Sequence, residues 1–141
     1  MYMGRFDHTI DAKGRMNVPS RFRDELGDEF VITQGLDGCI AVYDLTEWQK
    51  FEERLKTLPQ TDPDARKYIR FSLSCAYPCE VDKQGRILIP TPLREYAKLT
   101  KDVVVSGALD KVEIWDKDRF IEENQYDNIN EVSEKLKGYK I

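Results

Sequence analysis

The chain has 141 residues, which is enough for one ordinary domain or for two very small ones that share a core. Hydrophobic residues make up 40% of it and charged residues 34%, which is typical of a folded chain with a polar surface. The longest apolar runs, such as Val103–Val105, are too short to cross a bilayer, and the first residues lack the apolar stretch of a secretory signal. We therefore expect a cytoplasmic protein without a membrane partner.

The charge is unevenly distributed along the chain. The formal net charge of −4 argues against a uniformly basic nucleic-acid binder. Residues 5–23, however, carry five arginines and lysines against two aspartates, whereas acids gather in 44–53 and 116–134. A local field at a contact surface can outweigh the sum over the whole chain, so nucleic-acid binding is not excluded. The odd count of three cysteines favours free thiols over a disulfide framework.

The first part of the chain predicts two short strands, a short helix and a hairpin. Lys13-Gly14 indicates a turn because glycine adopts positive φ without a steric penalty. Pro19 ends the second strand because proline cannot donate to the ladder. Asp37-Gly38 between apolar runs is a strong hairpin signal. The predicted elements are strands at 6–10 and 16–18, a helix at 20–26, and hairpin strands at 30–35 and 40–43.

Two helices are predicted next. Thr46 followed by Gln49 indicates a capping box, and Pro59 ends this helix. Asp62-Pro63 begins the second helix. Apolar side chains recur at helical spacing in both, namely Trp48, Phe51, Leu55 and Leu58 in the first and Ala65, Tyr68, Ile69 and Leu73, predicted to face inward, in the second.

The remainder predicts the same succession of elements again. Strands at 77–81 and 87–89, a helix at 92–97, and hairpin strands at 103–107 and 111–115 are expected, the last two around the weaker turn Leu109-Asp110. Asp116 then caps one long amphipathic helix with a charged outer face. Its apolar residues are Phe120, Ile121, Ile129, Val132 and Leu136.

These two successions share residues at a constant offset. The identical pairs are Asp11/Asp82, Gly14/Gly85, Arg15/Arg86, Pro19/Pro90 and Arg23/Arg94. Apolar character recurs at Met16/Ile87, Val18/Ile89 and Phe22/Leu93. So many ordered matches indicate a duplicated module. The division that follows is module 1 at 5–47, a helical connector at 48–75, module 2 at 76–119, and a C-terminal amphipathic helix and tail at 120–141.

The paired Asp-x-x-x-Arg turns, within 3–15 and 82–90, resemble the MraZ family, a branch of the AbrB/SpoVT-type swapped-hairpin regulators. The likeness covers nearly the whole chain. It implies an α+β, β-rich fold in which the duplicated module forms a pseudo-symmetric β-barrel with flanking helices. It also implies a homo-oligomeric ring, octameric by family likeness, that binds repeats in double-stranded promoter DNA. The regulated genes would be the bacterial operon for division and cell-wall synthesis, which places the protein at the nucleoid.

Carried over by position, the two loops would face DNA. An arginine can grip a phosphate or the O6/N7 edge of guanine with two hydrogen bonds, and a lysine adds a point charge. The aspartates are poor phosphate ligands and are assigned to orienting the arginines or stapling the turns. The predicted DNA-binding residues are Lys13, Arg15, Lys83 and Arg86, and the predicted loop-orienting residues are Asp11, Gly14, Asp82 and Gly85.

Simpler alternatives accompany this interpretation. Each Asp–Arg pair would by itself be a surface salt bridge worth only about 0–1 kcal/mol. Arg23 and Arg94 fall in the short helices, where pairing with Glu25 or Glu95 is equally reasonable, so they are left outside the predicted site. The competing function is an oligomeric protein-interaction module without specific DNA binding, which explains the acidic composition.

Catalysis and metal binding are not expected. No phosphate loop, dinucleotide motif or zinc-protease motif is present, and His8, the only histidine, has no recognisable nucleophile beside it. Cys75 and Cys79 lack the two-residue gap of zinc knuckles, so the cysteines are interpreted as buried small side chains. No enzyme, cofactor, metal or small-molecule substrate is predicted.

Overall fold

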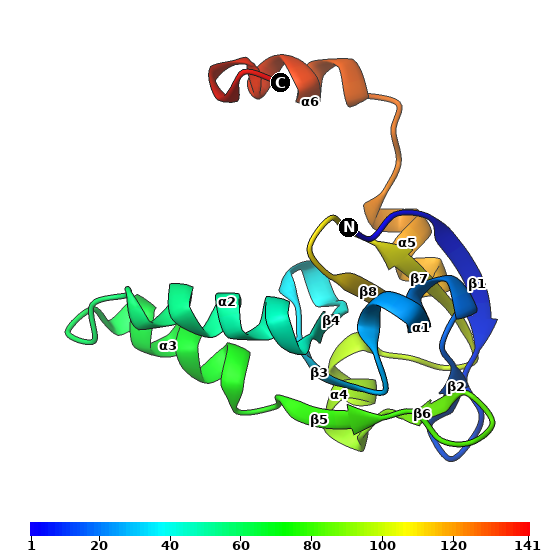
Figure 1. The fold of residues 1–141 in the computed structure, drawn as a ribbon. Helices are drawn as coiled ribbons and strands as arrows, with labels where there is room; N and C mark the ends of the chain where they lie inside the picture. The colour runs from blue at the N-terminus through cyan, green and yellow to red at the C-terminus, as the bar shows by residue number, and fades with distance from the viewer.

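A computed structural model describes residues 1–141 as a mixed α+β fold with an antiparallel six-stranded sheet, a two-stranded ribbon and six α-helices (Figure 1). The order in the large sheet is β1-β7-β8-β4-β3-β5, and β2 pairs with β6 in the ribbon. These strands are β1 (Arg5–Thr9), β2 (Arg15–Asn17), β3 (Glu29–Gln34), β4 (Ile40–Asp44), β5 (Tyr77–Glu80), β6 (Arg86–Leu88), β7 (Asp102–Gly107) and β8 (Val112–Asp116). The short helices α1 (Ser20–Leu26) and α4 (Thr91–Ala97) follow the two prolines. Every predicted strand forms within two residues of its expected bounds.

The two halves of the chain exchange strands. β1 of the first half pairs with β7 of the second, and β5 of the second half pairs with β3 of the first. β4 and β8 join the two hairpins at the centre of the sheet. The sheet does not close into the barrel that the family likeness implied, because β1 and β5 lie at opposite edges and do not pair. The fold is α+β as expected, but with an open sheet.

One face of the large sheet packs against the ribbon, α1 and α4. A single cluster of 19 buried residues fills this space, and it draws on both halves. Its most buried members include Phe22, Phe30, Ile32, Ile89 and Leu93. Burial of such side chains stabilises a fold by roughly 1.5–3 kcal/mol each, and here that gain requires both halves together. The ribbon is thus anchored on a shared core.

The other face of the sheet is covered by helices. α2 (Leu45–Lys56) and α3 (Pro63–Leu73) form an antiparallel pair that projects from the body (Figure 1). Phe51 and Leu55 of α2 pack on Ala41 and Tyr43 of β4. Phe120 of α5 (Lys117–Glu123) packs on Val104 and Trp115 nearby, in a cluster that also holds Cys39. No helix is both long and apolar enough to cross a membrane.

The start of α2 differs from the prediction. Asp44, and not Thr46, is the N-cap residue, and its carboxylate accepts a hydrogen bond from the Glu47 amide at 2.8 Å. The other carboxylate oxygen accepts the Tyr2 hydroxyl at 2.5 Å. Burial and this neighbouring carboxylate raise the pKa of Tyr2. Both Asp44 and Thr46 are good caps, and the contact with distant Tyr2 favours Asp44.

Two further helix predictions were wrong. Leu73 is 41% exposed instead of facing inward, while Ala65 is buried as expected. The C-terminal segment forms two helices, α5 and α6 (Ile129–Lys135), instead of one. The α5–α6 break at 124–128 is rich in Asn and Asp, which compete with helical hydrogen bonds, and the Asn124 side chain donates to the Phe120 carbonyl. Asp116 caps α5 as predicted.

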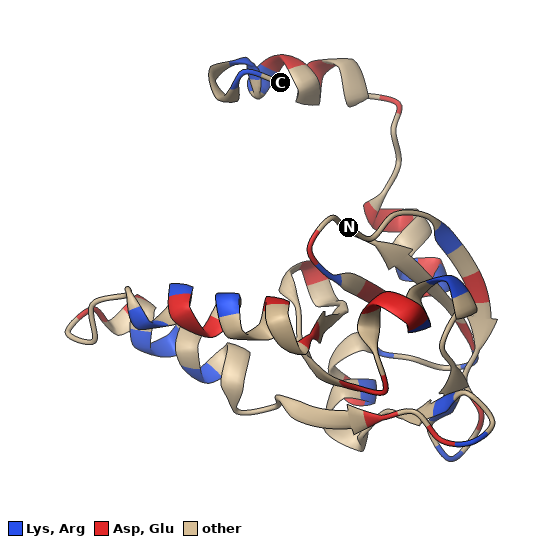
Figure 2. Ribbon diagram, viewed as in Figure 1, with Lys and Arg blue, Asp and Glu red and all other residues tan.

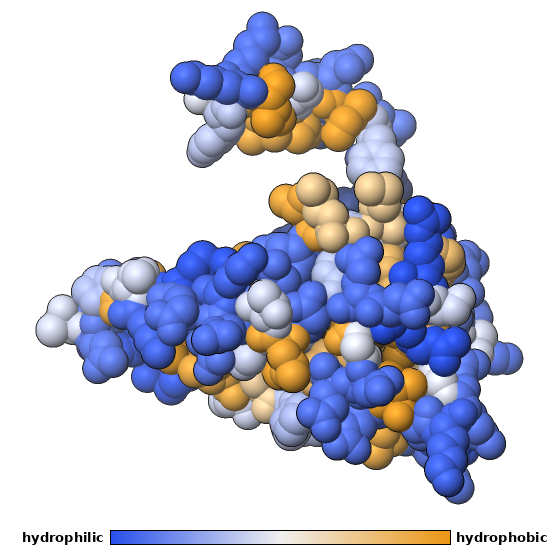
Figure 3. Space-filling model, viewed as in Figure 1, coloured by the Kyte–Doolittle hydropathy of each residue, from blue (hydrophilic) through white to orange (hydrophobic).

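α6 lies away from the body (Figure 1). Ile129, Val132 and Leu136 are 48%, 37% and 37% exposed. Figure 3 shows hydrophobic side chains on the side of this helix that faces the body. The apolar stripe predicted here therefore exists but has no partner within the chain.

The assignment of the α2 cap can be tested by two substitutions. Asp44→Ala removes the cap and leaves the Tyr2 hydroxyl without its acceptor, so we expect a loss of about 1–2 kcal/mol in the free energy of unfolding. Thr46→Ala, two residues away on an exposed side chain, should change it by less than about 0.5 kcal/mol. Urea denaturation measures both, and a larger effect of Thr46→Ala would contradict the assignment.

Candidate nucleic-acid interface

The ribbon β2–β6 brings the two predicted loops together. Arg15 lies opposite Leu88, Met16 opposite Ile87, and Asn17 opposite Arg86. Met16 and Ile87 are each 2% exposed and join the core. Because directly opposite residues share a face and successive residues alternate, both arginines lie on the outer face of one ribbon. We call the ribbon with its loops, residues 11–18 and 82–89, the head.

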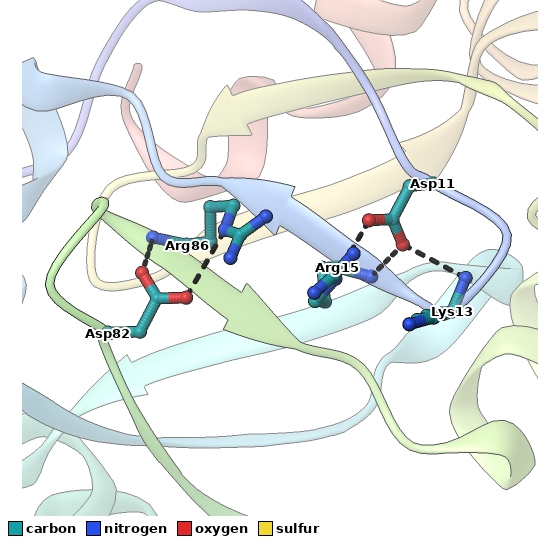
Figure 4. Close-up of polar contacts among 5 residues, drawn as sticks. All are labelled: Asp11, Lys13, Arg15, Asp82 and Arg86. Atoms are coloured by element: carbon teal, nitrogen blue, oxygen red, sulfur yellow. Dashed lines mark hydrogen bonds and ion pairs between the residues drawn. The ribbon is translucent and has the colours of Figure 1, made fainter.

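The first loop is organised by one carboxylate. Asp11 Oδ1 accepts the backbone amides of Lys13 at 3.0 Å and Arg15 at 2.9 Å. Its other oxygen, Oδ2, accepts Arg15 Nε at 2.8 Å (Figure 4). The hydrogen bond from the Arg15 amide, with help from the guanidinium, lowers the pKa of Asp11, although partial desolvation opposes the shift. Asp11 thus fixes the turn and the arginine at once.

The second loop repeats this arrangement. Asp82 Oδ1 accepts the amides of Gln84 and Arg86, both at 2.9 Å. Oδ2 accepts Arg86 Nε at 3.2 Å, and Figure 4 shows the two contacts between Asp82 and Arg86. The backbone amide of Arg86 is again the main cause that lowers the pKa of the carboxyl. Asp82, like Asp11, therefore accepts hydrogen bonds both from the backbone of the turn and from its own arginine.

Both guanidinium groups keep their outer edge available. Each arginine uses only Nε toward its aspartate, and the terminal Nη atoms have no protein acceptor. The side chains are 36% exposed for Arg15 and 28% exposed for Arg86. The free Nη edge is the part of arginine that can make paired hydrogen bonds with a phosphate or a guanine.

Backbone contacts lock each loop to the opposite strand. The Val18 amide donates to the Gly85 carbonyl at 3.0 Å, and the Ile89 amide donates to the Gly14 carbonyl at 2.8 Å. Gly14 and Gly85 have φ of 89° and 79°, values that L side chains rarely adopt. A Cβ on Gly14 would also lie 2.9 Å from the Ile89 carbonyl oxygen. Glycine is therefore required at both turns for conformation, and at Gly14 also for the close approach of the Ile89 backbone.

Two arginines outside the predicted site also belong to this region. Arg94 of α4 lies against Gly14 of the first loop, and Arg23 of α1 lies against Gly85 of the second loop. Arg94 donates to the Ile89 carbonyl at 2.9 Å. Neither arginine pairs with an acid, so the alternative of a pairing with Glu25 or Glu95 is not realised. Their identity at equivalent positions of the two halves was the signal that could have found them.

The predicted lysines are both exposed, but they occupy different places in their loops. Lys13 is the second residue after Asp11, whereas Lys83 is the first residue after Asp82. Figure 2 shows basic and acidic residues side by side at this corner of the molecule. Both loop carboxylates are already bound to arginine and backbone amides. The unpaired charges of the head are therefore those of Lys13 and Lys83, and both are positive.

Other charged or potentially reactive side chains lie outside the head. Arg5 pairs with Asp7 at 3.1 Å, and its guanidinium lies 5.0 Å from the centre of the Phe120 ring. The three cysteines are free thiols, and burial raises the pKa of Cys79 to about 12, which makes it a poor nucleophile. No three His, Cys, Asp or Glu side chains gather as a metal site would require.

The fold and the head define a class of protein with two related halves that together display one cationic ribbon. Comparison with known proteins gives the family. The model of a family described as "MraZ protein, putative antitoxin-like" matches residues 1–71 and 73–137. The chain belongs to the MraZ family, as its paired turns predicted.

Full-length relatives agree with this assignment. A "Transcriptional regulator MraZ" of Caldanaerobacter subterraneus subsp. tengcongensis is 52% identical over 143 aligned positions, which cover 100% of both chains. A protein of the same name from Lachnoclostridium phytofermentans is 53% identical, and the alignment covers 100% of this chain and 99% of the relative. Another from Thermoanaerobacter sp. is 55% identical, and the alignment covers 94% of this chain and 91% of the relative. A family of transcriptional regulators also confirms the prediction that the chain is not an enzyme.

The double role of the loop carboxylate predicts different behaviour of two variants. Asp82→Asn keeps an oxygen that can accept the Gln84 and Arg86 amides, whereas Asp82→Ala removes it. Hydrogen exchange should therefore quicken at these two amides in Asp82→Ala and stay near wild type in Asp82→Asn. Asp24→Ala, which removes an exposed carboxylate outside the head, is the control. Equal exchange in all four proteins would show that the carboxylate does not hold the turn.

Proposed function

We propose that this protein is a sequence-specific DNA-binding transcriptional regulator that contacts promoter DNA through the head. The observation that carries the proposal is the pair of guanidinium groups, Arg15 and Arg86, on one face of a single ribbon with their Nη edges free. The name of the relatives supports it. By the family likeness, the target is the promoter of the bacterial operon for division and cell-wall synthesis, and the protein is cytoplasmic and nucleoid-associated.

The two-stranded form and the chemistry of the head suit the major groove of DNA. That groove, about 12 Å wide, admits a two-stranded β-ribbon, and arginine makes its commonest specific contact there with guanine. Lys13 and Lys83 would add phosphate contacts on either side. The loop-orienting residues Asp11, Gly14, Asp82 and Gly85 would hold this surface in one shape before DNA arrives, which lowers the entropy lost on binding.

One head offers few cations, and this favours an oligomer. Four phosphate contacts would give a log–log salt slope of only about −4. Several heads at fixed spacing on a homo-oligomeric ring, octameric by family likeness, would gain avidity on DNA that carries matching repeats. The exposed apolar residues of α6 support subunit contacts.

The exchange of strands between the halves fits the swapped-hairpin arrangement of the AbrB/SpoVT type. The proposal therefore includes the four-part division at 5–47, 48–75, 76–119 and 120–141.

The competing proposal is an oligomeric protein-interaction module without specific DNA binding. The unpartnered stripe on α6 favours it, but that proposal gives no role to the free guanidinium edges of the head.

Loss of either head arginine should weaken binding to promoter DNA. We expect Arg15→Ala and Arg86→Ala each to lower the affinity for the promoter upstream of the protein's own gene by about tenfold or more, because each removes a paired hydrogen-bonding group. The salt slope should fall by about 1 for every phosphate that the variant no longer neutralises. A mobility-shift titration at several salt concentrations measures both quantities.

Lys56→Ala is the matched control, since Lys56 is an exposed cation on α2 that pairs with Glu53. Its affinity should equal that of the wild type. The proposal fails if the folded double variant Arg15→Ala/Arg86→Ala retards promoter DNA as wild type does. Equal retardation of unrelated DNA by the wild type would instead favour the protein-interaction module.

A further inference from the structure

The outer face of the ribbon carries two side chains besides the arginines. Asn17 lies opposite Arg86, and Leu88 lies opposite Arg15. Both are exposed, and Leu88 is 57% exposed although it is a large apolar residue. Asn17 forms no side-chain hydrogen bond, and neither residue belongs to a core cluster. The packing of the chain therefore gives neither side chain a structural role.

These two residues occupy equivalent positions in the two halves. Asn17 follows Arg15 by two residues, just as Leu88 follows Arg86. The aspartate, glycine and arginine of each loop are identical between the halves, and the residues between, Met16 and Ile87, are both apolar and buried. On the outer face of the two ribbon strands, the near two-fold symmetry is therefore broken at this pair, while the loops also differ, at Ala12/Lys83 and Lys13/Gln84.

The two side chains have opposite recognition chemistry. An asparagine amide can donate and accept at once, which matches the N6/N7 edge of adenine in the major groove. A leucine offers only apolar contact, which matches the C5-methyl group of thymine. Neither carries charge, so neither adds to sequence-independent attraction to phosphates.

We propose that Asn17 and Leu88 are specificity-determining residues, and that their difference makes one head read a non-palindromic site in a single orientation. This inference rests on the proposed DNA-binding function and deepens it. Arg15 and Arg86 supply matching contacts on the two sides of the ribbon, and the Asn17/Leu88 pair tells the two sides apart.

Substitutions that make the outer face of the two ribbon strands symmetric test the inference. Asn17→Leu places leucine at both equivalent positions, and Leu88→Asn places asparagine at both. Selection of bound duplexes from a randomised pool should give an asymmetric motif for the wild type. Each variant should select a motif whose two halves are more nearly inverted repeats of each other. The reason is that the altered position, where the wild type prefers one base by about fivefold or more, takes on the base preference of the other side.

The control is Gln49→Leu, the same change of polar residue to leucine at a position of α2 outside the head, which should select the wild-type motif. Thermal unfolding of both head variants should match wild type because the altered side chains are exposed. If the wild type selects a motif and both head variants select the same one, this inference is overturned and DNA binding by the head stands. If the wild type selects no motif, the proposed function fails as well.

Discussion

The head depends on one carboxylate in each loop, which binds two backbone amides and the Nε of its own arginine. Without that carboxylate, a four-residue turn would leave its amides to water and its arginine free to rotate. With it, the guanidinium is held through Nε, and its Nη edge has no protein acceptor. The hydrogen bonds that make up this arrangement hold the pKa of Asp11 and of Asp82 below the ordinary aspartate value, which favours the ionised form that accepts them. The carboxylates bind and orient the arginines, and this explains why two aspartates lie within a cationic surface.

The arrangement also requires both halves of the chain. The carbonyls of Gly14 and Gly85 each accept an amide of the opposite strand, and Met16 and Ile87 anchor the ribbon in a core that draws on both halves. A single module would leave its loop unpaired and its side of the core open to water. Duplication within one chain therefore gives a two-loop head without a second molecule, and it lets the two sides diverge, as Asn17 and Leu88 have.

Local chemistry made much of this predictable from the sequence. Gly14 and Gly85 identified the turns, Pro19 and Pro90 the strand ends, and the repeat identified the head residues. Most of what failed depends on distant contacts. The choice of Asp44 over Thr46 as the α2 cap involves a contact with Tyr2. Whether the sheet closes depends on which distant strands pair. Arg23 and Arg94 each contact the loop of the other half of the chain. The α5–α6 break is the local exception. Apolar spacing continued across an Asn- and Asp-rich stretch whose side chains compete with helical hydrogen bonds.

Lysine footprinting tests most directly whether the head is the surface that meets DNA. The protein, with and without its promoter DNA, would be acetylated briefly and each lysine measured by mass spectrometry. We predict that DNA protects Lys13 and Lys83, while exposed Lys50 and Lys56 of α2 react as before. Full reactivity of Lys13 and Lys83 in a protein saturated with DNA would contradict the assignment of the head as the DNA-binding surface.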